Sequence, residues 1–283
     1  MDLLTFKQPA IWRDRGGWRF ALALILAGIA VTGTAAGGQP SVLVVDAGSG
    51  RTLRAAGADA VRYPASLTKM MTLYMLFEAL DRQQIRLHSR MRVSRSAAAK
   101  PPTELGLRPG QTISVNHAIQ AITTESANDM AALVGETLAG NESRFASRMT
   151  RKARALGMRR TAFGNASGLP HPAHRTTARD MAILARALLR HYPQYYHYFG
   201  QRRFIYAGTA HPNHNRLLGA YRGMDGIKTG YTRASGYNLV ASARRGGKRL
   251  IGVVMGSSSA AARNRTMARL LDTGFNKASN TRP

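Results

Sequence analysis

Strand-like segments stand at both ends of this 283-residue chain, and helix-like segments lie between them. Ser41–Asp46 and Arg51–Arg54 resemble two strands around a glycine turn, and Gly236–Arg244 with Arg249–Met255 resembles a second hairpin. Strands at the two ends that share one sheet leave the helices between them to pack against it. We therefore expect an α+β fold, with an antiparallel sheet, flanking helices, a mostly helical subdomain and a cleft at the seam.

The middle of the chain has the apolar spacing of helices, punctuated by glycine and proline. The expected helices cover residues 66–80, 115–123, 129–138, 142–156, 177–190 and, after the second hairpin, 263–271. The first of these helices is apolar on most sides, which predicts a buried position. Ser66 then lies at its start.

The amino terminus has the layout of a signal peptide. Basic residues up to Arg19 precede an apolar run, Phe20–Ala36, whose last third is Gly, Thr and Ala. We expect residues 1–36 to be a signal peptide, residues 37–276 one catalytic domain and residues 277–283 a tail, in a protein exported to the periplasm or cell envelope. An uncleaved leader is the alternative, so a peripheral or N-terminal membrane association stays open.

Composition excludes several classes of function. The chain has 41 Lys+Arg against 14 Asp+Glu, a formal net charge of +27, but an exported protein rarely meets DNA, so we expect no nucleic-acid partner. It contains no cysteine, which excludes disulfides, thiolate metal sites and cysteine nucleophiles.

Three short motifs occur in order: Ser66-Leu-Thr-Lys69, Ser126-Ala-Asn128 and Lys228-Thr-Gly230. Each motif alone is weak, and a Ser or Asn at a helix boundary is usually a cap. For this composition, however, chance would produce the whole trio only about 0.01 times. The three motifs therefore predict one site.

The spacing within these motifs suits nucleophilic catalysis. Residues three apart share a helix face, so Lys69 can reach the Ser66 hydroxyl as its base. An ordinary lysine would need about 4.6 kcal/mol to be neutral at pH 7, so burial beside a second cation, Lys228, is needed to lower its pKa. Asn128 can bind both Lys69 and a substrate carbonyl, and Ser126 can pass a proton to a departing amine. Lys228 and Thr229 suit a carboxylate, while Gly230 lets substrate backbone come close.

Over residues 40–276 the chain resembles the D-alanyl-D-alanine carboxypeptidases among the low-molecular-weight penicillin-binding proteins. Beyond the trio, the likeness rests on segments 64–65, 126–129, 152–158, 163–169, 177–180 and 225–232. The resemblance implies a β-lactamase/DD-peptidase-like fold and a peptidoglycan stem peptide as substrate. It implies an acyl-enzyme on Ser66, acylation of Ser66 by β-lactam inhibitors, and no cofactor or metal.

The resemblance also implies roles for individual residues. Lys69 is the expected base and Ser126 the expected proton relay, while Asn128 and Lys228 orient substrate. The N–H groups of Ser66 and Tyr231 are the expected oxyanion hole. Arg263 matches, more loosely, an arginine that helps bind the terminal carboxylate.

Other functions compete with this one. Many family members carry an extra β-rich domain after the catalytic one, and the shorter branch that this chain resembles can also cut D,D-crosslinks, so an endopeptidase stays open. A class A β-lactamase would need a Glu some 35 residues after the second motif, which this chain lacks. A non-catalytic peptidoglycan-binding protein is the alternative from another class.

Two further features are better explained by structural roles than by functional sites. The histidine pairs 171/174 and 211/214 each enclose a proline, so we expect loop histidines and no zinc site. The aromatic stretch Tyr192–Phe199 favours packing over a carbohydrate platform.

Overall fold

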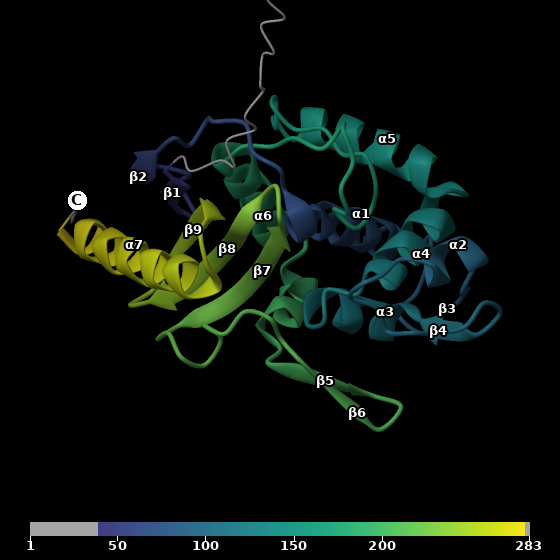
Figure 1. Ribbon diagram of the computed structural model, residues 1–283. Coiled ribbons are helices and arrows are strands. Elements are labelled where there is room, and N and C mark those ends of the chain that lie inside the picture. Colours follow the sequence, from purple (N-terminus) through teal and green to yellow (C-terminus); the bar gives the residue numbers. More distant parts are fainter. Residues whose placement is uncertain (1–38, 281–283) are drawn as a thin grey trace, which may run out of the picture. The chain divides into compact units, whose positions relative to one another are not determined.

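The computed structural model describes residues 39–280, and within them strands from both ends of the chain form one antiparallel sheet (Figure 1). The order across the sheet is β2 (Thr52–Ala56), β1 (Ser41–Asp46), β9 (Lys248–Ser257), β8 (Gly236–Arg245) and β7 (Met224–Thr232). β1 pairs with β9 over its full length, from Ser41 opposite Met255 to Asp46 opposite Leu250. The predicted shared sheet is confirmed, and it leaves β7 at one edge.

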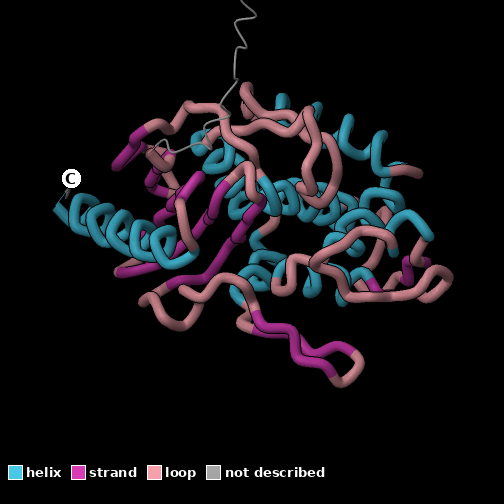
Figure 2. The backbone as a smooth tube through the Cα atoms, in the orientation of Figure 1, coloured by secondary structure: helices cyan, strands magenta, loops and turns pink. Residues whose placement is uncertain are grey.

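Apolar side chains alternate between the two faces of this sheet, so each face needs its own cover. Val42 and Val44 belong to the smaller core, beneath α7 (Ala260–Asn280). Leu43 and Val45 belong to the larger core, which includes α6 (Ala178–His191). Figure 2 shows the strands flanked by these helices.

The helical region continues from the larger core. It contains α1 (Lys69–Asp81), α3 (Val115–Thr123), α4 (Asn128–Ala139) and α5 (Glu142–Ala155). α1 is apolar on most sides, as predicted, and its Met70, Leu73 and Phe77 side chains are fully buried. A buried helix can hold a catalytic side chain in one position, because packing restricts its motion.

Three predicted helices begin within one residue of their predicted starts, each after a capping side chain. The N-cap side chain accepts a hydrogen bond from the backbone N–H three residues later at Ser114, Asn141 and Thr177, which precede α3, α5 and α6.

Several short elements were not predicted. They are β3 (Arg90–Arg92), α2 (Arg95–Ala98), β4 (Thr112–Ser114), the 3-10 helix η2 (Pro193–Gly200) and the hairpin strands β5 (Arg203–Tyr206) and β6 (Thr209–Pro212). The four strands and α2 have only three or four residues each, too few to show a hydrophobic period. The aromatic stretch that includes η2 packs as expected, with Tyr195 stacked on Phe77 at 5.0 Å between ring centroids.

Two predicted helix boundaries were wrong. Residues 65–68 form a separate 3-10 turn, η1 (Ala65–Thr68), so Ser66 precedes the α-helix proper. The last helix, expected over residues 263–271, is α7 and runs to Asn280, which makes residues 277–280 of the predicted tail helical. The predicted signal peptide lies outside the described residues. No helix within 39–280 has the length and apolar character to cross a bilayer.

Candidate active site

The fold brings the three sequence motifs together beside the edge strand β7. A Cβ atom built on Gly230 would lie 3.1 Å from both Ser66 N and Pro64 O, so β7 runs almost in contact with η1. A larger residue at this position would push the strand away from Ser66. Glycine therefore allows the third motif to approach the first.

Lys69 occupies the centre of the site. Its fully buried Nζ lies 3.1 Å from Ser66 Oγ, 2.7 Å from Asn128 Oδ1 and 2.7 Å from the Ser167 carbonyl oxygen. The Asn128 amide NH₂ donates to the Pro101 carbonyl at 3.2 Å, which directs its oxygen toward Lys69. Two of the three neighbours of Nζ can therefore only accept hydrogen bonds.

This arrangement accommodates a neutral amine whose lone pair faces Ser66. A neutral lysine amine has two N–H donors and one lone pair. The Asn128 and Ser167 oxygens take the two donors, and the lone pair is left for the Ser66 hydroxyl proton. Burial lowers the pKa of Lys69 well below its usual range, and the Lys228 cation lowers it further. The sequence-based expectation of a lowered lysine pKa agrees with this result.

Lys228 is the second buried amine of the site. Its Nζ donates to the Thr229 carbonyl at 3.0 Å. Burial, followed by the positive charge of Arg263, lowers the pKa of Lys228 to about 7. Arg263, on α7, is also buried, which lowers its pKa to about 10. Glu125 offsets this effect on Lys228 only in part, so the two neighbouring cations favour the binding of an anion.

Arg263 is held against the sheet by its own contacts. Its guanidinium donates to the Asn238 carbonyl at 3.4 Å and to Asn264 Oδ1 at 2.8 Å and 3.0 Å. The structure thus places Arg263 within the electrostatic field of Lys228 and anchors it from β8 and α7.

Backbone strain is concentrated at the site. Four non-glycine residues among those described have positive φ, and two of them are Ala65 and Ser126. A left-handed backbone at such residues costs on the order of 1–3 kcal/mol and persists where the surrounding structure enforces it. Ser126 is buried, and its Oγ has no hydrogen-bond partner within residues 39–280. A buried hydroxyl in this state is available to a ligand.

Thr229 and Tyr231 lie on the last part of β7. Thr229 is buried, whereas the Tyr231 ring is 55% exposed and packs on Tyr237 at 4.3 Å between centroids. A cavity of about 1180 Å³ adjoins Tyr231 and is lined in part by Tyr63 and His174. It offers room for a substrate that extends beyond the reacting bond.

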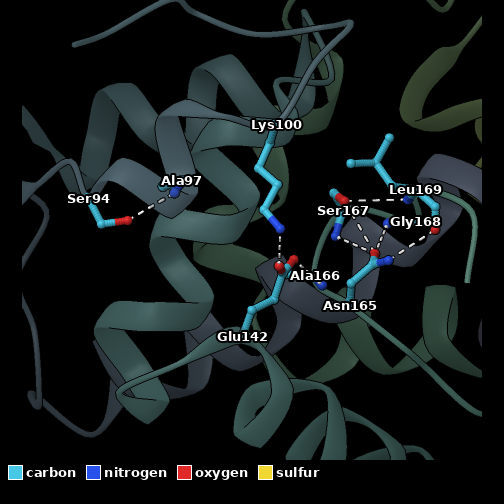
Figure 3. Close-up of polar contacts among 9 residues, drawn as sticks. All are labelled: Ser94, Ala97, Lys100, Glu142, Asn165, Ala166, Ser167, Gly168 and Leu169. Carbon is cyan, nitrogen blue, oxygen red and sulfur yellow. Dashed lines mark hydrogen bonds and ion pairs between the residues drawn. The ribbon is translucent and has the colours of Figure 1, made fainter. Parts of the chain in front are cut away.

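The loop after α5 supplies a functional group that sequence reasoning missed. Its contribution is the Ser167 carbonyl, a backbone atom that no side-chain motif can reveal. Asn165 Oδ1 accepts from the N–H groups of Ser167 and Gly168, at 3.2 Å and 2.7 Å, and shapes the turn (Figure 3). Gly168 has φ +84°, and a Cβ atom there would lie 1.9 Å from the Ala65 carbonyl oxygen, so only glycine fits.

Asp129 was also missed as part of the site, although it adjoins the second motif. Its carboxylate accepts from the N–H groups of Leu105, Gly106 and Met130, at 2.9 Å, 3.2 Å and 2.8 Å. These bonds fix the segment that contains Pro101, the partner of Asn128. The signal was present in the sequence, since Asp129 belongs to a segment that carries the family resemblance.

The histidine pairs make no metal centre in the described part of the chain. The rings of His171 and His174 lie 5.9 Å apart. No group of three or more His, Asp or Glu side chains within residues 39–280 is arranged to hold a metal ion.

Comparison with known proteins places this geometry in a family. The model of the D-alanyl-D-alanine carboxypeptidase family matches residues 34–259. Among curated proteins, D-alanyl-D-alanine carboxypeptidase DacF of Bacillus subtilis is 34% identical over 84% of this chain, and DacC of Escherichia coli is 36% identical over 82%. The alignments cover 62% and 60% of those two relatives, so the chain spans about three fifths of their length.

Solved structures agree with this assignment. D-alanyl-D-alanine carboxypeptidase DacD from Francisella tularensis has a TM-score of 0.81 at 28% identity, covering 83% of this chain and 69% of that one. Penicillin-binding protein D2 from Listeria monocytogenes, in its ampicillin-bound form, has a TM-score of 0.77 at 30% identity, covering 83% and 96%. The expected DD-peptidase-like fold is confirmed. The chain belongs to the D-alanyl-D-alanine carboxypeptidase family.

Proposed function

We propose that this protein is a serine-type D-Ala-D-Ala carboxypeptidase that acts on peptidoglycan stem peptides through an acyl-enzyme on Ser66, and that β-lactams acylate the same serine. The observation that carries the proposal is the contact of Ser66 Oγ with a buried lysine amine at 3.1 Å. Membership of the family and the β-lactam complex of a structural relative support it.

Acylation begins with the Ser66–Lys69 pair. Lys69 Nζ takes the hydroxyl proton while Oγ forms a bond to the carbonyl carbon between the two D-alanines. The carbonyl oxygen becomes an oxyanion, which the backbone N–H groups of Ser66 and Tyr231 stabilise. Loss of one such donor typically costs about 2.7–4 kcal/mol of transition-state stabilisation.

Collapse of this intermediate breaks the C–N bond. The departing D-alanine amine needs a proton, which passes from Lys69 through the Ser126 hydroxyl. The unpartnered Ser126 Oγ is available for this relay. Water then attacks the ester, the Ser66 Oγ–carbon bond breaks, and the shortened stem peptide leaves with a new carboxylate.

Substrate binding uses the opposite wall of the cleft. Lys228 and Thr229, with Arg263 nearby, receive the terminal carboxylate, and Asn128 orients the substrate amide. The lowered pKa values of Lys228 and Arg263 support this role, because a bound carboxylate would compensate both charges. The cavity beside Tyr231 accommodates the remainder of the stem.

Two measurements test the proposal. A fluorescent penicillin should label the wild-type protein at Ser66 and leave Ser66→Ala unlabelled. Incubation with defined monomeric and crosslinked muropeptides, followed by mass spectrometry, should show D-alanine release from the pentapeptide. Cleavage confined to crosslinked substrate would instead support the endopeptidase, and no product from either would overturn the proposal.

We also propose that the protein works outside the cytoplasmic membrane, where peptidoglycan lies, after export by its N-terminal leader. The basic and apolar pattern of residues 1–36 supports this location. Cell fractionation and N-terminal sequencing of the mature protein test export, leader removal and membrane association together. Retention of the protein in the cytoplasm would contradict it.

A further inference from the structure

Glu142 lies outside the three motifs, yet its carboxylate joins two segments of the site. One oxygen, Oε2, is 2.8 Å from Lys100 Nζ. The other, Oε1, accepts a hydrogen bond from the Ala166 backbone N–H at 3.1 Å. Figure 3 shows Lys100 and Glu142 facing each other beside the loop that contains Ala166 and Ser167.

Through Ala166, Glu142 is linked to the Ser167 carbonyl oxygen, which is one of two protein oxygens that accept a hydrogen bond from Lys69. Ala166 is held on both sides, since its N–H donates to Glu142 and its carbonyl accepts from Thr72 Oγ1 at 2.7 Å. The next carbonyl along the chain, that of Ser167, is the acceptor for Lys69 Nζ at 2.7 Å. A shift of Ala166 would therefore move this acceptor.

Through Lys100, the same ion pair is linked to the second acceptor of Lys69, the Asn128 side-chain oxygen. Lys100 directly precedes Pro101, whose carbonyl accepts from the Asn128 amide at 3.2 Å. That contact turns the Asn128 oxygen toward Lys69 Nζ, 2.7 Å away. Two peptide bonds, Ala166–Ser167 and Lys100–Pro101, complete these links. Together with the hydrogen bonds and the ion pair, they connect Lys69 through Ser167, Glu142, Lys100 and Asn128 back to Lys69.

We propose that Glu142 and Lys100 are positioning residues, which hold the Ser167 and Asn128 oxygens so that the lone pair of Lys69 faces Ser66. The inference rests on the proposed function for its catalytic consequence. The positioning itself is a property of the folded chain and can be measured without substrate.

The charge of Glu142 provides a second readout, which needs no substrate. The groups that act on Lys69 come from three directions: Lys228 on β7 lowers its pKa, whereas Asp129 on α4 and Glu142 on α5 raise it. Removal of the Glu142 charge should therefore lower the pKa of Lys69. Removal of the Lys100 charge should raise it, because the Glu142 carboxylate then acts uncompensated.

The chain offers a matched control pair, Lys152 and Glu78. Their Nζ–Oε1 distance is also 2.8 Å, and their side-chain exposures, 26% and 17%, match the 26% and 15% of Lys100 and Glu142. The control pair joins α5 to α1, the helix that carries Lys69, but its partners make no contact with the motifs. It reproduces the Lys–Glu distance and exposure, although Glu78 Oε1 also pairs with Arg82 at 2.9 Å.

The kinetic experiment compares five variants of the full-length protein, Glu142→Ala, Glu142→Gln, Lys100→Met, Glu78→Ala and Glu78→Gln, in their rate of acylation by a fluorescent penicillin. The acylation rate of Glu142→Ala should fall at least about tenfold, since a charge-assisted hydrogen bond contributes about 1.5–3 kcal/mol. Glu142→Gln should lose less, because its amide oxygen can still accept from Ala166. Both Glu78 variants should acylate at the wild-type rate. An equal loss in the Glu78 and Glu142 variants would overturn the proposal.

The second measurement needs no activity and also covers a Glu142→Ala protein that does not fold. Titration of ¹³C-labelled lysine side chains by NMR follows Lys69 directly, with Lys69→Met for assignment. The Lys69 midpoint should move down in Glu142→Gln, up in Lys100→Met and stay in place in Glu78→Gln. An unchanged midpoint in both Glu142→Gln and Lys100→Met contradicts the inference. A wild-type protein that shows these shifts but does not react with penicillin contradicts the proposed function alone.

Discussion

The helical wall and the strand wall of the site each carry a buried lysine, and the surroundings of the two amines differ. On the helical wall, Lys69 Nζ is surrounded by three oxygens, from Ser66, Asn128 and Ser167. On the strand wall, Lys228 Nζ has one hydrogen bond in the described part of the chain, to the Thr229 carbonyl. Burial lowers the pKa of both amines.

This difference separates a base from a binding group. Lys69 has its donors occupied by protein, which leaves its lone pair for one neighbour. Lys228 keeps donor capacity, because only one of its N–H groups has a hydrogen-bond partner in residues 39–280. We infer that similar burial produces two functions, because the hydrogen-bond partners differ. The predictions below test this contrast, from the largest expected effect to the smallest.

Ser66→Ala should abolish covalent labelling by penicillin, with a loss of about 10⁵-fold or more in turnover, because no other group can form the ester. Intact-protein mass spectrometry measures the adduct. The variant should keep the wild-type melting temperature, since the Ser66 side chain is half-buried and its one hydrogen-bond partner in residues 39–280 is Lys69. An adduct that persists in the variant would place the nucleophile elsewhere.

Lys69→Met should reduce the acylation rate by about 10²–10⁴-fold, the usual contribution of a general base. Methionine fills a similar volume, but the Asn128 and Ser167 oxygens lose their donor, so stability should fall by about 1–3 kcal/mol for each unsatisfied oxygen. Stopped-flow labelling and thermal unfolding give the two quantities. A variant that acylates at more than a tenth of the wild-type rate would contradict the assignment of Lys69 as the base and of Lys228 as the binding group.

Lys228→Gln should cost about 10–150-fold in kcat/KM for peptides with a free terminal carboxylate, the value of a charge-assisted hydrogen bond of about 1.5–3 kcal/mol. For a peptide amide of the same sequence the loss should be smaller, since the carboxylate contact is already missing. Equal losses for both peptides would mean that Lys228 acts in proton transfer and not in recognition.

The acidic limb of the pH profile should report on Lys69, on the helical wall, and the alkaline limb on Lys228, on the strand wall. Activity should rise with pH as Lys69 loses its proton, and in the free enzyme it should fall again around the pKa of Lys228, which is about 7. Each limb should change kcat/KM about tenfold per pH unit away from the optimum. Lys228→Arg keeps a cation at high pH and should move only the alkaline limb upward. An alkaline limb that stays in place in this variant would assign it to another group.

Sequence reasoning was most successful where a local signal existed. The helix α5, which follows the capping side chain of Asn141, began where predicted. The strands β8 and β9 matched within a few residues because their apolar spacing is long and regular. The start of α1 was described incorrectly, because a 3-10 turn and an α-turn have the same residue preferences over four positions.

The amino-acid sequence by itself determined the elements at both ends of the chain, the one-turn spacing of Ser66 and Lys69, and the glycine that β7 needs at Gly230. These depend on local periodicity and on residue type. Tertiary structure alone decided which oxygens surround Lys69, that Glu142 is tied to the Ser167 loop, and how far burial lowers the two lysine pKa values. The reason is physical: carbonyl groups are common to all residues, and desolvation is created only when distant segments pack together.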